Sequence, residues 1–140
     1  MYVRKFLFKA GISAKNISMA EASFKTASYP IIIRENHLDT FGHVNNAAYL
    51  VIFEEARWEI VSSKGFDLIS IQEKKQGPVI LEIQLKFLKE LTLRQQVFIK
   101  TKVASYAGKI GILKQWIEDS RGQIYCEAEF KVGLFDLQAR

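Results

Sequence analysis

The sequence predicts an α+β domain in which a five-stranded antiparallel sheet wraps around one long central helix. A strand-like segment comes first, a long apolar helical segment follows, and four segments of alternating apolar and polar residues come last. The chain has 140 residues, which suits one domain with a sizeable core. No repeat or linker divides it. We therefore expect a single domain over residues 22–140, preceded by a basic N-terminal arm or an additional strand over residues 1–21.

The first main strand is expected from Phe24 to Arg34, because the run SYPIII is rich in side chains that suit a pleated surface. Pro30 has no N–H to donate, so this segment should be an edge strand or contain a bulge there. The basic bias of residues 1–34 is similar to that of a transit peptide. A basic arm is the favoured interpretation, since YVRKFLFKAGI suits a strand and lacks the apolar core of a secretory signal.

The central helix is expected to begin at Asn45 or Asn46 and to end at about residue 63 or 64. Either asparagine can accept hydrogen bonds from the free N–H groups of a first helical turn. Apolar residues recur at helical spacing from Tyr49 to Ile60. The first half is apolar nearly all round, which predicts a helix that is buried on several sides.

Four strands are expected after a polar stretch over residues 70–77. Their alternating patterns run over residues 79–87, 97–103, 110–116 and 124–132. In the third of them, Ile110, Ile112 and Trp116 share one face. Short connections, including the turns AGK and DSRG, make the strands antiparallel. One helix leaves the other face and the edges of such a sheet uncovered. We therefore expect a homodimer, in which a second copy covers them.

The composition argues against several classes of partner and site. The net charge of +5 suggests an anionic partner, but the basic residues are scattered and no nucleic-acid motif is present. The single cysteine, Cys126, cannot form a disulfide within the chain, which favours a reducing, cytoplasmic compartment. One cysteine and two histidines do not make a zinc site, and no apolar run is long enough to span a membrane.

The stretch HLDTFGHVNNAAYL, over residues 37–50, places an acid, a glycine, a histidine and two asparagines directly before the helix. Its ordinary interpretation is a loop that caps the helix, since capping explains one asparagine and an aspartate is common in such loops. Its functional interpretation is a reaction site, in which a carboxylate faces the unpaired N–H groups at the positive end of the helix dipole.

The pattern D-x-x-G-H-V-N-N-x-x-Y followed by F-E-x-A-R, from Asp39 to Arg57, resembles the hotdog-fold thioesterases. More narrowly, it resembles the branch that contains 4-hydroxybenzoyl-CoA thioesterase and related acyl-CoA or acyl-carrier-protein thioesterases. The resemblance covers roughly residues 22–135. It implies the hotdog fold, thioester hydrolysis, no cofactor beyond the CoA of the substrate, and a homodimer or a dimer of dimers (a homotetramer).

Two positions depart from the pattern of this branch. His37 stands where members often have a second acid, which bears on the electrostatics of the site. Residues 94–96 stand where a Gly-Asp pair commonly precedes the third strand, which affects only a turn.

Thioester hydrolysis requires a nucleophile or base and a group that stabilises the developing oxyanion. The resemblance implies that Asp39 is the catalytic carboxylate, either as direct nucleophile or as base for a water. It also implies that the backbone N–H of Asn46, seven residues later, polarises the thioester carbonyl. Gly42 would let the loop turn tightly and bring Asp39 towards the helix.

His43 can orient a water, hold the loop by a hydrogen bond or simply pack, and holding the loop is the favoured role over catalysis. Asn45 and Tyr49 are candidate substrate-binding residues, although capping explains the first and core packing the second. Glu54 and Glu55 lie on the helix, where another hotdog branch has its catalytic carboxylate, but a solvated or Arg-paired role is favoured.

Two alternative functions stay open at this point. The first is a hotdog enoyl-CoA hydratase or dehydratase, which the spacing D-T-F-G-H without a proline argues against. The second is a non-catalytic, acyl-ligand-binding hotdog protein, which the intact Asp39 argues against. Five basic residues can either meet the phosphates of CoA or form a solvated strand face: Lys86, Lys89, Arg94, Lys100 and Lys102.

Overall fold

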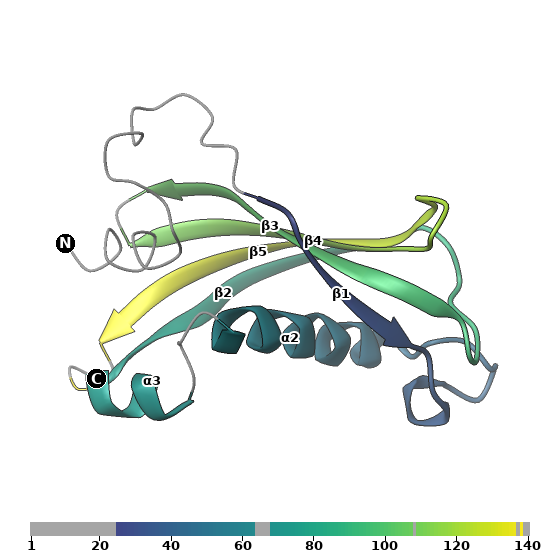
Figure 1. Cartoon of the computed structure of the whole chain (residues 1–140), viewed down its shortest axis with the longest axis horizontal. Helices are drawn as coiled ribbons and strands as arrows, with labels where there is room; N and C mark the ends of the chain where they lie inside the picture. Colours follow the sequence, from purple (N-terminus) through teal and green to yellow (C-terminus); the bar gives the residue numbers. More distant parts are fainter. Residues whose placement is uncertain (1–24, 64–67, 108, 137, 139–140) are drawn as a thin grey trace.

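The computed structural model describes residues 25–63, 68–107, 109–136 and 138 (Figure 1). The arm or additional strand expected over residues 1–21 lies outside this part. In chain order the elements are β1 (Ala27–Ile32), the short 3-10 helix η2 (Glu35–His37), α2 (Asn46–Ser63), α3 (Leu68–Lys74), β2 (Gln76–Phe87), β3 (Gln96–Ala107), β4 (Ile110–Glu118) and β5 (Ile124–Asp136).

The sheet confirms the predicted fold class. Its five strands run in the order β1-β3-β4-β5-β2, and every neighbouring pair is antiparallel. β1 is an edge strand, as Pro30 predicts. The other edge is β2, which pairs with β5 rather than with β3, its successor in the chain. The two edge strands are therefore the first two strands in the described part of the chain.

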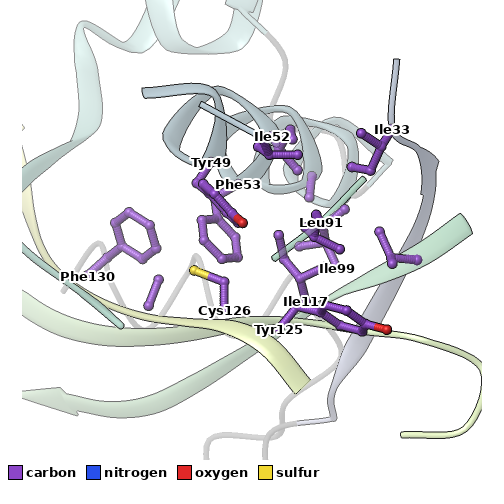
Figure 2. Close-up of a cluster of buried hydrophobic side chains, with 14 residues drawn as sticks. Ile33, Tyr49, Ile52, Phe53, Leu91, Ile99, Ile117, Tyr125, Cys126 and Phe130 are labelled. Carbon is purple, nitrogen blue, oxygen red and sulfur yellow. The ribbon is translucent and has the colours of Figure 1, made fainter. Parts of the chain in front are cut away.

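Helix α2 lies against the concave face of the curved sheet (Figure 1). It buries Tyr49, Ile52, Phe53 and Ala56, one face of its first three turns. Figure 2 shows the ring of Phe53 above Cys126 of β5, with Phe130 of the same strand to its left, and the two phenylalanine rings meet edge to face. Burial of each such side chain stabilises the fold by about 1.5–3 kcal/mol.

Two local features differ from the sequence prediction. Residues 68–74 form α3, although the stretch over residues 70–77 gave no helical signal. In β4 the predicted face of Ile112 and Trp116 is the outer one, and the side that faces the core includes Gln115 and Ile117, which are 1% and 0% exposed. The turn at residues 107–109 includes a residue that the structure does not describe.

Candidate active site

The loop before α2 is closed by its own backbone. Leu38 and Val44 form an antiparallel bridge, and the N–H of Asp39 donates to the carbonyl of His43 at 2.8 Å. The N–H of Gly42 returns to the carbonyl of Asp39 at 3.2 Å, and Gly42 has a φ of +80°. A left-handed conformation of this kind favours glycine, so the sequence sets the shape of the loop at this residue.

The two carboxylate oxygens of Asp39 have different surroundings. Oδ1 accepts hydrogen bonds from the N–H groups of Phe41, at 2.8 Å, and His43, at 3.2 Å. Oδ2 has no hydrogen-bond partner among the residues that the structure describes. One oxygen thus fixes the orientation of the half-buried side chain. The other is left to act as nucleophile or base.

The start of α2 supplies a donor. The side-chain Oδ1 of Asn45 accepts from the N–H of Ala47 at 2.8 Å, so Asn45 is the capping residue and the choice between the two asparagines is settled. The backbone N–H of Asn46 has no acceptor within the described part of the chain. It therefore remains an open donor at the positive end of the α2 dipole, as an oxyanion site requires.

The loop is fastened to the connection between β2 and β3. The N–H of Val44 donates to the carbonyl of the fully buried Leu91 at 3.1 Å. His43 forms a backbone bridge with Thr92, and its Nε2 lies 3.1 Å from a carboxylate oxygen of Glu90. This geometry agrees with the loop-holding role expected for His43. Glu90 is a residue that sequence reasoning missed, because nothing in a linear pattern links it to a histidine 47 residues earlier.

His37, which replaces the second acid of the motif, has a local role. Its Nδ1 accepts from the N–H of Arg34 at 3.1 Å, which caps η2, and its carbonyl accepts from the N–H of Asn45 at 2.8 Å. His37 thereby joins the end of η2 to the beginning of α2.

Tyr49 and Cys126 belong to the core. Tyr49 is 4% exposed, and its ring meets Phe87 edge to face at 5.1 Å between centroids. Burial is the main cause that raises the pKa of Tyr49 to about 12. Burial likewise raises the pKa of the Cys126 thiol to about 12, so this thiol is not a nucleophile at neutral pH. On the opposite side of α2, Glu55 accepts a hydrogen bond from the hydroxyl of Tyr29 at 2.7 Å.

The basic side chains named from the sequence do not gather in one place. Lys86 on β2 and Lys100 on β3 are separated by β4 and β5, a distance of about 14 Å across three strand spacings. Lys100 pairs with Glu118, Arg94 pairs with Glu35, and the Nζ of Lys89 lies over the ring of Tyr125. In the described part of the chain, no group of three or more His, Cys, Asp and Glu side chains is arranged to hold a metal ion, and no helix is long and apolar enough to cross a membrane.

Residues 33–140 match the model of the thioesterase-like superfamily. The chain is 31% identical over 112 residues to the long-chain acyl-CoA thioesterase FadM of Escherichia coli, and the match covers 79% of this chain and 83% of FadM. It is 29% identical over 72 residues to the chloroplastic acyl-acyl carrier protein thioesterase ATL3 of Arabidopsis thaliana, and that match covers 51% of this chain and 38% of ATL3.

Solved structures show the same architecture. The YbaW probable thioesterase of Escherichia coli has a TM-score of 0.71 and 29% identity, with 80% of this chain and 84% of that one covered. The DHNA-CoA thioesterase of Staphylococcus aureus has a TM-score of 0.72, with 80% and 75% covered. Its 19% identity is evidence for the fold alone. These similarities confirm the hotdog fold that the motif of the loop and helix predicts.

Proposed function

Because this chain belongs to the thioesterase-like superfamily, we propose that it hydrolyses acyl thioesters with Asp39 as the reactive carboxylate and the first turn of α2 as the oxyanion site. One observation carries this mechanism. An open carboxylate oxygen on Asp39 and an open backbone donor on Asn46 occur together, seven residues apart, in the loop before α2 and the start of α2.

The thioester carbonyl oxygen accepts from the N–H of Asn46, which stabilises the negative charge that develops there. Asp39 either removes a proton from the attacking water or attacks the carbonyl carbon itself. In the first route the water adds to the carbonyl carbon, the carbon–sulfur bond breaks, and Asp39 passes the proton to the leaving thiolate. In the second route the acyl group is transferred to Asp39 as a mixed anhydride while the thiolate leaves, and water then cleaves the anhydride and supplies the proton of the thiol. In a single turnover in ¹⁸O-labelled water, label that enters Asp39 identifies direct attack followed by water addition at the carboxylate carbon.

Substitution of Asp39 by Asn tests the assignment of the reactive carboxylate. The amide oxygen can still accept from Phe41 and His43, so the loop and the fold should stay intact. We expect kcat to fall by about 10²–10⁴-fold, the usual contribution of a positioned acid or base. The measurement is thiol release with a chromogenic thiol reagent, and unfolding curves serve as the control. An active Asp39→Asn variant would place the reaction elsewhere.

Acyl-CoA and acyl-carrier protein are the two substrate classes that we propose. Long-chain acyl-CoA is the first to test, because FadM is named for that activity. A panel of short, long and aromatic acyl-CoAs, together with acyl-carrier protein, identifies the acyl group and the carrier. The substrate itself brings the CoA, and we propose that the reaction needs no further cofactor.

We also propose that β2 pairs with β2 of a second copy, in a dimer or a dimer of dimers. The support is an edge strand that exposes several apolar side chains: Val79 (38%), Ile80 (37%), Leu81 (44%), Ile83 (40%) and Phe87 (51%). Phe87 touches Tyr49 in the first turn of α2, so a partner on this edge would border the site. The unpaired thiol of Cys126 supports a cytoplasmic location.

A further inference from the structure

A polar cluster lies at the centre of the otherwise apolar contact between α2 and the sheet. Gln115 on β4 is 1% exposed and Thr101 on β3 is 9% exposed, and they are the buried polar side chains in the described part of the chain. Arg57 of α2 lies beside them, with its guanidinium 4.3 Å from the centre of the Phe130 ring. A polar cluster in this position is stable only when its members satisfy one another.

The amide of Gln115 makes three hydrogen bonds. Its oxygen accepts from Nη1 of Arg57 at 2.7 Å. Its nitrogen donates to the backbone carbonyl of Phe53 at 3.1 Å and to the hydroxyl of Thr101 at 2.9 Å. Rotation of the amide by half a turn would place its oxygen against the Phe53 carbonyl, so the orientation is unique. We call Gln115, Thr101, Arg57 and the Phe53 carbonyl the Gln115 clamp.

The clamp holds α2 at two points that lie one helical turn apart. The carbonyl of Phe53 already accepts the N–H four residues later in the helix, and Gln115 adds a second donor from the sheet. Apolar side chains tolerate small shifts of a helix, whereas hydrogen bonds weaken steeply when their angle or length changes. The clamp therefore fixes both the rotation of α2 and its position along its own axis.

The position of α2 matters at the proposed site because the two groups there, Asp39 and the N–H of Asn46, are held by different parts of the structure. The loop of Asp39 is fastened to the β2–β3 connection through Val44 and His43. The N–H of Asn46 belongs to α2, about 10 Å along the axis from Phe53. A shift of α2 against the sheet would change the distance between carboxylate and oxyanion donor, and a misplacement of about 1 Å can cost about 10²-fold in rate.

We propose that Gln115 is a positioning residue for the thioesterase reaction, since it sets the place of the Asn46 N–H relative to Asp39. This proposal rests on the proposed function. Gln115→Met keeps the volume of the side chain but removes all three hydrogen bonds. We expect kcat to fall about tenfold, with KM changed less than twofold, because a transition-state contact is affected rather than substrate binding.

The matched control is Ile117→Val, which alters a fully buried side chain on the same face of the same strand without touching a hydrogen bond. It should lower stability by about 0.5–1.5 kcal/mol and leave kcat within about twofold. Thr101 provides a milder pair of variants. Thr101→Val should lower kcat less than Gln115→Met does. Thr101→Ser keeps the hydroxyl and should have the kcat of the wild-type protein.

Deuterium uptake over residues 46–63 tests the clamp independently of activity, and should be faster in Gln115→Met than in Ile117→Val. Equal uptake in the two variants would overturn the clamp, even if the wild-type protein released no thiol and the proposed function failed. Faster uptake with unchanged kcat would overturn the positioning role. All kinetic comparisons should be made well below the melting temperature of each variant.

Discussion

Gly42 determines the shape of the loop before α2 through its backbone rather than through contacts. Its φ is +80°, and no atom lies within 4 Å of the place that a Cβ would occupy. Gly42→Ala should cost about 1–2 kcal/mol in backbone strain, and should also lower kcat because the turn that orients Asp39 relaxes.

Gly122 offers a matched control for this substitution. It has the same φ of +80° and the same open surroundings, but it lies in the turn between β4 and β5. Gly122→Ala should therefore cost similar stability and leave kcat unchanged. If both variants lost activity to the same degree, the effect of Gly42 would be one of stability and not of loop geometry.

His43 and Glu90 should act as one unit in holding the loop, since His43 Nε2 lies 3.1 Å from Glu90. We expect His43→Ala and Glu90→Ala each to lower kcat by a similar factor, and the double variant to be no worse than either one. A double-mutant cycle on kcat measures this coupling. Losses that multiply in the double variant would mean that the histidine acts on its own, for example on a water.

Arg94 shows strain in the turn before β3. It has a φ of 64°, where an ordinary side chain is disfavoured, and its ion pair with Glu35 is largely exposed. Arg94→Gly should therefore raise the free energy of unfolding by up to about 1 kcal/mol, because relief of the strain outweighs an exposed ion pair. Glu35→Gln removes the pair alone. A raised KM for acyl-CoA in Arg94→Gly, but not in Glu35→Gln, would reveal a contact with substrate.

The secondary structure was predictable wherever it follows a regular pattern. Alternation located β2 to β5, and the asparagines located the start of α2. Helix α3 was missed because its seven residues, LISIQEK, are too few to show helical periodicity. Gln115 was missed as a core residue because alternation favours apolar side chains. Its partners lie 14 to 62 residues away in the chain, so only the folded structure brings them together.

The position of the proposed site was predictable only in part. Asp39 and Asn46 lie in one contiguous motif, so a single sequence pattern identifies both residues as candidates. Glu90 joins them only through the folded β2–β3 connection, and the different surroundings of the two Asp39 oxygens depend on hydrogen bonds that no sequence pattern reveals.

The proposed pairing of the whole molecule along β2 makes a testable prediction about assembly. Ile83→Glu replaces an exposed apolar side chain of β2 by a charge and should give monomers with reduced activity. Gln84→Glu adds the same charge to the next residue, whose side chain lies on the opposite face of the sheet, and should leave the assembly intact. Light scattering coupled to gel filtration measures the mass. A fully active wild-type monomer would contradict the proposal.

The strand order also has a consequence for how the chain folds as it is made. β1 and β2 are synthesised first, yet their partners β3 and β5 come later, and β5 ends only at Asp136. The three central strands can form successive hairpins quickly, whereas the edge strands must wait to join them, which raises the contact order. Until β3, β4 and β5 have been made, the apolar side of α2 has no sheet to cover it. A nascent chain of this fold should therefore depend on protection from aggregation until its last strand has left the ribosome.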